Sequence, residues 1–102
     1  MLNNEENMYY REVLIEEKRR KRDNFVRKMT PIWIEEGKKM RYIRDGLCIS
    51  RREISELIGF STSTVASFEA GNPIRNRWYF EKAYRLAIKY IQIIRREIAN
   101  DI

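Results

Sequence analysis

The sequence predicts an all-α protein, a compact bundle of five helices with an extra N-terminal helix and a long C-terminal helix. Three observations support this prediction. The 102-residue chain holds only two prolines and four glycines, so long stretches are free to be helical. Its apolar residues recur at spacings of three and four, which place them on one face of a helix. Capping residues and glycines mark the ends of successive segments.

The first predicted element is a charge-rich helix over residues 5–28, within an N-terminal extension of residues 1–29. Its apolar positions include Tyr9 and Val13, but residues 15–24 contain only one large apolar side chain, Ile15. Such a segment cannot bury much surface by itself. We therefore expect it either to project into solvent or to become ordered on DNA or a protein partner.

A second helix is predicted from Pro31 to Arg44, at the start of a domain of residues 30–102. Thr30 is a preferred N-cap, and proline suits the first helical position because an N–H there would have no helical partner. Gly46 is expected to end the helix in the left-handed conformation. The candidate core residues are Ile32, Ile34, Met40 and Ile43.

Two short helices are predicted next, over residues 51–58 and 62–69. Ser50, followed three residues later by a glutamate, matches a capping box at the start of the first. Gly59 ends this helix, and Ser61 is the expected N-cap of the next. The residues expected to face inward are Ile54, Leu57, Ile58, Val65 and Phe68.

The last predicted helix is long and covers residues 76–99. Its predicted apolar stripe consists of Trp78, Ala83, Leu86, Ala87, Tyr90, Ile91, Ile94 and Ile98. The end of this stripe extends beyond what a small core needs. It is therefore a candidate homodimer face, or a bed for the N-terminal helix.

The two eight-residue helices around a Gly-x-Ser turn have the size and spacing of a helix-turn-helix. Ser55 and Gly59 are small enough for the helices to cross closely, and Val65 can hold the second helix on the first. Short polar residues at the start of the second helix suit entry into the major groove of DNA. They can donate to phosphates or to base edges without steric conflict.

The stretch ISRREISELIGFSTSTVASFEAGNP, residues 49–73, resembles the lambdoid Cro and repressor type of helix-turn-helix, also called the xenobiotic-response-element family. The matching positions are Ser50, Ile54-Ser55, Gly59-Phe60-Ser61, Val65 and Phe68-Glu69-Ala70-Gly71. With the flanking helices, the resemblance covers residues 34–92. It implies a lambda-repressor-like DNA-binding bundle without a cofactor.

The resemblance also implies roles for individual residues. It implies base contacts from Thr62, Ser63 and Ser67, and phosphate or backbone contacts from Arg51, Ser61, Thr64, Asn72, Arg75 and Arg77. Arg51 stands where family members usually carry a glutamine that binds a phosphate and braces a base-reading side chain. Arginine can keep the phosphate contact, but whether it also braces the base-reading side chain is in doubt. Arg44 and Glu69 match an ion pair between helices that some members contain.

The formal net charge of +6 favours a polyanionic partner, either nucleic acid or an anionic membrane surface. The charge is uneven, at −4 over residues 1–17, +9 over residues 18–52 and +1 over the rest. A basic run consists of Lys18, Arg19, Arg20, Lys21 and Arg22. It is either a solvated helix face paired with nearby glutamates or an accessory arm that contacts phosphates.

Several other classes of protein are disfavoured. The chain has no histidine and a single cysteine, Cys48, so we expect no metal site and a buried structural thiol. No nucleophile, acid–base or phosphate-loop motif is present, which argues against an enzyme. No apolar run approaches the length of a membrane span, and no signal peptide is recognisable. We therefore expect a cytoplasmic protein.

These features together predict a sequence-specific transcriptional regulator, a repressor of the phage or mobile-element type. It would bind a double-stranded DNA operator by placing the helix of residues 62–69 in the major groove, as a homodimer if the C-terminal helix pairs. Two alternatives stay open. One is a protein-interaction module on the same scaffold that binds an antirepressor, a toxin or a phage protein. The other is a nucleoid-type binder driven by the basic run.

Overall fold

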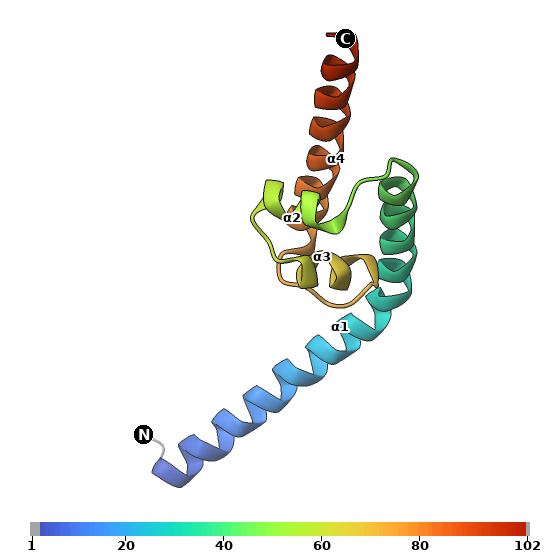
Figure 1. The fold of residues 1–102 in the computed structure, drawn as a ribbon. Helices are drawn as coiled ribbons and strands as arrows, with labels where there is room; N and C mark the ends of the chain where they lie inside the picture. The colour runs from blue at the N-terminus through green and yellow to red at the C-terminus, as the bar shows by residue number, and fades with distance from the viewer. Residues whose placement is uncertain (1–2, 102) are drawn as a thin grey trace.

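The computed structural model describes residues 3–101, which form four α-helices and contain no strand. The helices are α1 (Asn4–Gly46), α2 (Arg51–Ile58), α3 (Thr62–Glu69) and α4 (Arg77–Asn100). The all-α prediction is confirmed, but the predicted number of five helices is wrong. The first two residues of the predicted extension and the last residue of the predicted domain lie outside the described range. The molecule is elongated, at 76 × 25 × 17 Å, and α1 and α4 project from opposite ends (Figure 1).

The helix count is lower because α1 runs through the expected boundary at Thr30-Pro31. Thr30 is not an N-cap, since its hydroxyl donates a hydrogen bond of 2.6 Å to the carbonyl of Val26 within the helix. Pro31 has no N–H to donate to the carbonyl of Arg27, and its ring crowds that carbonyl. A proline inside a helix therefore bends it, and Figure 1 shows α1 bent between its two halves.

The N-terminal half of α1, which we call the arm (residues 3–25), is exposed at every position. It begins at an N-cap, where the Asn3 side chain accepts from the N–H of Glu6 at 2.8 Å. Ion pairs one turn apart join Glu16 to Arg19 at 3.6 Å and Glu17 to Arg20 at 3.8 Å. Exposed pairs of this kind contribute little stability. The expectation that this segment projects into solvent is confirmed.

The second half of α1 packs against the rest of the molecule through Trp33, Gly37, Met40 and Arg44. The core that it covers contains the fully buried side chains of Met40, Ile54, Val65, Phe68, Phe80 and Tyr84. The inward placement expected for Met40, Ile54, Val65 and Phe68 is confirmed. Ile32 and Leu57 were also expected in the core but are 48% and 46% exposed. Leu57 lines an open hollow between α2 and α4 rather than the core.

The inward face of α4 differs from the predicted stripe. The buried residues of α4 are Phe80, Tyr84, Ala87, Ile88 and Ile91, of which only Ala87 and Ile91 were predicted. The other large residues of the predicted stripe, Trp78, Leu86, Tyr90, Ile94 and Ile98, are exposed. Apolar residues occur on more than one side of α4, so periodicity alone does not determine the buried side. The Phe80 ring selects that side by packing between Phe60 and Phe68, at centroid distances of 5.1 and 4.9 Å.

The turn between α1 and α2 also differs from expectation. Gly46 is the last residue of α1, and the left-handed residue is Cys48, with φ of 54°. The Cys48 side chain is exposed, so the prediction of a buried structural thiol is wrong. The turn buries its neighbour Ile49 instead, which is 2% exposed, and the N–H of Ile49 donates to the carbonyl of Arg44 at 3.1 Å.

Candidate nucleic-acid interface

The turn between α2 and α3 has the geometry that the sequence predicted. Gly59 ends α2 in the left-handed conformation, with φ of 76°. The Ser55 hydroxyl donates to the carbonyl of Phe60, which holds the turn against α2. Ser61 caps α3 by accepting from the N–H of Thr64 at 3.1 Å. At the start of α2, Ser50 and its glutamate partner form the expected capping box. These local bonds set the direction in which α3 leaves the turn.

The N-terminal end of α3 presents hydroxyl groups to solvent. Ser61, Thr62 and Ser63 are exposed, whereas Thr64 and Ser67 are half-buried. The hydroxyls of Ser61 and Thr64 lie 2.9 Å apart and hydrogen-bond to each other. The side chains of Thr62 and Ser63 are therefore the most accessible polar groups at this end of the helix. Unpaired N–H groups at a helix N-terminus also favour anions such as phosphate.

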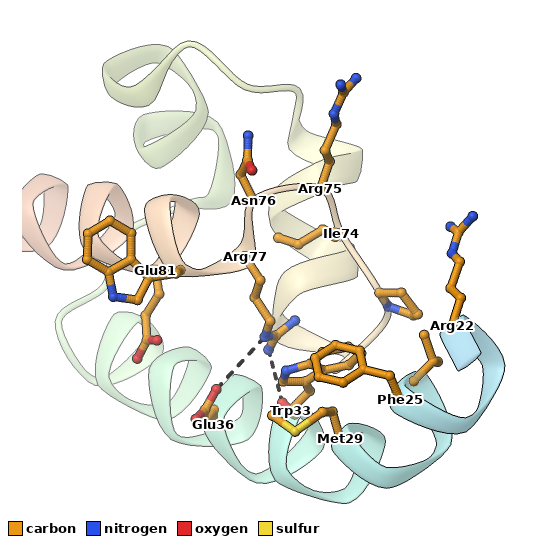
Figure 2. A pocket seen from close by; sticks show the side chains of 13 residues that line it. Arg22, Phe25, Met29, Trp33, Glu36, Ile74, Arg75, Asn76, Arg77 and Glu81 are labelled. Atoms are coloured by element: carbon orange, nitrogen blue, oxygen red, sulfur yellow. Dashed lines mark hydrogen bonds and ion pairs between the residues drawn. The ribbon is translucent and has the colours of Figure 1, made fainter. Parts of the chain in front are cut away.

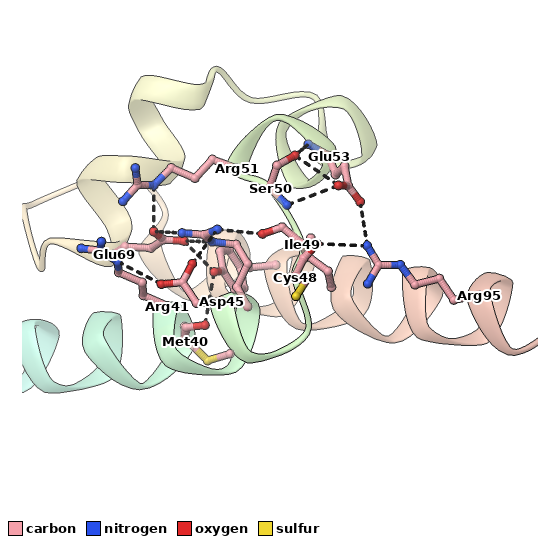
Figure 3. Close-up of polar contacts among 12 residues, drawn as sticks. Met40, Arg41, Asp45, Cys48, Ile49, Ser50, Arg51, Glu53, Glu69 and Arg95 are labelled. Atoms are coloured by element: carbon pink, nitrogen blue, oxygen red, sulfur yellow. Dashed lines mark hydrogen bonds and ion pairs between the residues drawn. The ribbon is translucent and has the colours of Figure 1, made fainter.

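The opposite end of α3 is held by a buried ion cluster around Glu69, whose side chain is only 1% exposed (Figure 3). Arg44 binds this carboxylate with two nitrogens, Nε at 2.6 Å and a terminal nitrogen at 3.0 Å. A third nitrogen of Arg44 donates to the carbonyl of Ile49 at 2.7 Å. The Tyr84 hydroxyl donates to Glu69 at 2.7 Å. The ion pair expected between Arg44 and Glu69 is thus confirmed, and it ties α3 to α1.

The cluster keeps Glu69 ionised despite its burial. Burial by itself raises the pKa of the carboxyl, but hydrogen bonds from Arg44, Tyr84 and Arg51 outweigh it and hold the pKa below its usual range. The same cluster raises the pKa of Arg44, chiefly through its hydrogen bond to Glu69. Burial and the bond to Glu69 also raise the pKa of the Tyr84 hydroxyl well above its usual range. All members therefore hold their charge state near neutral pH.

Arg51 links this cluster to the protein surface. Its Nε donates to Glu69 at 2.9 Å, and its side chain is 38% exposed. Figure 3 shows its two terminal nitrogens directed away from Glu69. A guanidinium with one nitrogen anchored and two free to donate is preorganised for an oxygen ligand. The geometry is therefore compatible with the phosphate contact that the resemblance implies.

The three residues expected to contact the DNA backbone in and after the loop between α3 and α4 lie in different environments. Asn72 and Arg75 are exposed, but the Arg77 side chain is only 9% exposed. The Arg77 guanidinium donates to the carbonyls of Asn72, Trp33 and Phe68 at 3.1–3.3 Å. It also lies over the rings of Trp33 and Phe68, at 5.3 and 4.6 Å from their centroids. The predicted phosphate contact of Arg77 is corrected to a structural role, which joins the start of α4 to α1 and α3.

The buried position of Arg77 has an electrostatic cost. Burial lowers the pKa of its guanidinium, although Glu36 and Glu81 counteract this. Its Nε has no hydrogen-bond partner, and the nearest carboxylate oxygen, from Glu36, is 3.8 Å away (Figure 2). An arginine still charged at neutral pH and stacked on two aromatic rings is well suited to such a position.

The basic run lies on the exposed arm, and its last member approaches the loop before α4. Arg22 and Arg75 line one open hollow of about 760 Å³, together with Phe25, Trp33 and Trp78. Figure 2 shows the side chains of Arg22 and Arg75 extending to the same side of the molecule. Lys18 and Arg19 line a second hollow with Pro73. The bend in α1 thus brings basic side chains of the arm near the loop that follows α3.

Sequence reasoning missed the close approach of α1 to the end of α3. A Cβ atom at Gly37 would lie 2.7 Å from the carbonyl oxygen of Phe68, and one at Gly71 would lie 2.6 Å from the Cα atom of Ile34. Only glycine permits these backbones to pack so closely. Gly37 is flanked by strong helix formers, and such an isolated glycine inside a helical pattern is the signal that could have revealed the contact.

Comparison with known proteins adds no assignment, because no family model, no curated protein and no solved structure matches the chain. Residues 3–101 include no group of acidic, histidine or cysteine side chains that could hold a metal ion. No helix in this part of the chain combines the length and apolar character needed to cross a membrane. The resemblance to the Cro and repressor family therefore remains an expectation that rests on the residues quoted above.

Proposed function

We propose that the protein is a sequence-specific DNA-binding transcriptional regulator, acting as a repressor with a lambda-repressor-like fold. The observation that carries this proposal is the contrast between the two ends of α3. Its C-terminal end is held by the buried cluster of Arg44, Glu69 and Tyr84, while its N-terminal end exposes Thr62 and Ser63. A rigid helix with short polar groups at a free N-terminus suits insertion into the major groove.

In the proposed complex, α3 lies in the major groove of an operator. Thr62 and Ser63 contact base edges, and Ser67 contributes from the next turn. The phosphate contacts come from Arg51, Ser61, Thr64, Asn72 and Arg75. Hydroxyl side chains discriminate bases less sharply than the bidentate pairs that are worth about 1–3 kcal/mol. Specificity therefore also depends on the sequence-dependent shape and deformability of the DNA.

The basic run on the arm is proposed to contribute to DNA affinity. Arg22 extends to the same side as Arg75, and the rest of the basic run precedes it on the same helix (Figure 2). Each phosphate neutralised by such a side chain strengthens binding and steepens its salt dependence. The arm is proposed to add affinity without adding sequence preference, because phosphates are the same at every site.

The test is a selection of bound genomic DNA fragments at about 150 mM salt, a concentration that suppresses purely electrostatic binding. The native protein is compared with Thr62→Ala/Ser63→Ala and with a control variant, Gln92→Ala, whose exposed side chain lies on α4. We expect a short motif that the control retains and the double variant loses. Recovery without sequence preference, unchanged by the double variant, would overturn the proposal in favour of a nucleoid-type binder.

A protein-interaction module is the second candidate, and the exposed apolar residues of the arm favour it. Tyr9, Leu14 and Phe25 are each more than half exposed. If the selection recovers no DNA, binding of another protein through the arm becomes the better explanation.

A further inference from the structure

Two apolar patches of the molecule stay largely exposed within the described chain. The first, the arm patch, consists of Tyr9, Tyr10, Val13 and Leu14, which are 42–63% exposed. Positions i, i+1, i+4 and i+5 share one side of a helix. Glu6 lies four residues before Tyr10 and Glu17 lies four residues after Val13, so a carboxylate stands at each end of this patch.

The second, the α4 patch, consists of Leu86, Tyr90, Ile93 and Ile94, which are 36–65% exposed. Their spacing of i, i+4, i+7 and i+8 places them on one side of α4, beside the side that faces the core. Three basic residues seven positions apart, Lys82, Lys89 and Arg96, follow one edge of this patch. At the other edge, Tyr90 and Ile94 line an open hollow with Glu53, Glu56 and Leu57 of α2. The α4 patch thus combines an apolar centre with one basic edge, on the side away from α2.

The charges of the two segments are opposite and similar in size. Residues 3–17 contain five glutamates and one arginine, for a net charge of −4. Residues 77–100 contain six Lys/Arg and two glutamates, for a net charge of +4. Pairing α4 with a second α4 would bring two basic segments together, and pairing two arms would bring two acidic segments together. Pairing an arm with an α4 instead joins apolar patches and opposite charges.

The two patches cannot meet within one chain. The arm and the free end of α4 project from opposite ends of a molecule 76 Å long (Figure 1). The intrachain arrangement, with α4 as a bed for its own N-terminal helix, therefore does not occur in this structure. A second copy of the chain can supply both an arm and an α4.

We propose that the arm patch of one copy packs on the α4 patch of a second copy, and that the second arm packs on the first α4 in return. Such an exchange is isologous, because each contact occurs twice around a two-fold axis. The arms, which are already helical in the single chain, pack on the partner on assembly, and the two apolar patches of each copy become buried. This contact goes beyond the proposed reading of DNA and needs no DNA to form.

The first test measures the mass of the full-length protein by sedimentation without DNA, from nanomolar protein to about 100 μM. A dissociation constant near 1 μM would make dimers dominant at the upper end of that range. We expect a dimer that dissociates on dilution. A monomer over the whole range would overturn the inference.

Charge exchange tests which surfaces meet. Glu17→Lys and Lys89→Glu each replace two attractions in the dimer by repulsions, so each should raise the dissociation constant about tenfold. The double variant Glu17→Lys/Lys89→Glu restores both attractions and should recover the native dimer. Glu35→Lys is the matched control, since it makes the same charge change at an exposed residue outside both patches. Failure of the double variant to recover would contradict the arm–α4 contact.

Disulfide cross-linking provides an independent readout. One tagged chain carries Val13→Cys and a differently tagged chain carries Tyr90→Cys, both with Cys48→Ser because the native thiol is exposed. Oxidation of the mixture should join the two different tags. Cross-links between Tyr90→Cys chains alone would instead show α4 pairing with α4 and overturn the proposal.

The outcomes also separate this inference from the proposed function. A monomer that still selects a DNA motif would overturn the exchange of arms and leave DNA reading in place. A dimer that selects no DNA motif would overturn the proposed reading of DNA and leave the exchange of arms in place.

Discussion

The two halves of α1 belong to one helix but lie in opposite environments. The arm is exposed at each of its residues 3–25, whereas the second half buries Trp33, Gly37, Met40 and Arg44. The arm has an N-cap and ion pairs that act within one or two turns. The second half has contacts to residues far away in the sequence, such as Glu69 and Phe68. Local signals thus suffice to form the helix. Only contacts with residues distant in the sequence fix the position of one half of that helix relative to the rest of the protein.

The two halves are expected to differ most in the free energy of unfolding that is lost when one charged side chain is removed from each half. Arg44→Ala leaves Glu69 buried without its main partner, and breaking a buried pair in this way costs roughly 3–5 kcal/mol of unfolding free energy. Arg19→Ala in the arm removes only an exposed pair, so the expected change is within about 0.5 kcal/mol. Urea denaturation of both variants measures the contrast. Equal effects of the two substitutions would show that the cluster does not anchor α3.

A smaller effect is expected from a single added methyl group. Gly37→Ala places a Cβ atom against the backbone carbonyls of Phe68 and Glu69, and overpacking of this kind costs about 1–3 kcal/mol. Gly46→Ala is the matched control in the same helix, because nothing lies within 4 Å of its added Cβ. The control should be neutral or stabilising by up to about 1 kcal/mol. Thermal unfolding of the pair tests the close approach of α1 to α3.

The smallest effect on stability is expected from a change of pH, because pH acts on the cluster only by protonating Glu69. The pKa of Glu69 is below its usual value of 4.5 in the folded protein. Its contribution to stability is therefore present above pH 4.5 and is lost as the pH falls through the lower, folded-state pKa. Glu69→Gln removes this titration. We expect the stability difference between the native protein and Glu69→Gln to shrink in acid, and a constant difference would contradict the lowered pKa.

Much of the local structure could be predicted because its causes lie within a few residues of each other. The capping box at Ser50, the cap at Ser61 and the left-handed Gly59 were all confirmed. The Arg44–Glu69 pair was predicted across 25 positions, but only through the resemblance to a known family. Composition and spacing alone do not contain that contact.

The remaining errors share one physical origin. Thr30-Pro31 is compatible with a helix start and with a bend inside a helix, although the bend costs about 3 kcal/mol locally. The apolar residues of α4 allow more than one buried side, and Arg77 can extend to solvent or fold inward. In each case, the choice depends on surfaces supplied by distant residues, such as Trp33 and Phe68 around the Arg77 guanidinium. The sequence by itself determined α2 and α3, their caps at Ser50, Gly59 and Ser61, and the hydroxyl-rich start of α3, because these depend on neighbours within one or two turns. Only the tertiary structure decided which sides are buried and where α1 bends, because packing joins residues that the sequence keeps apart.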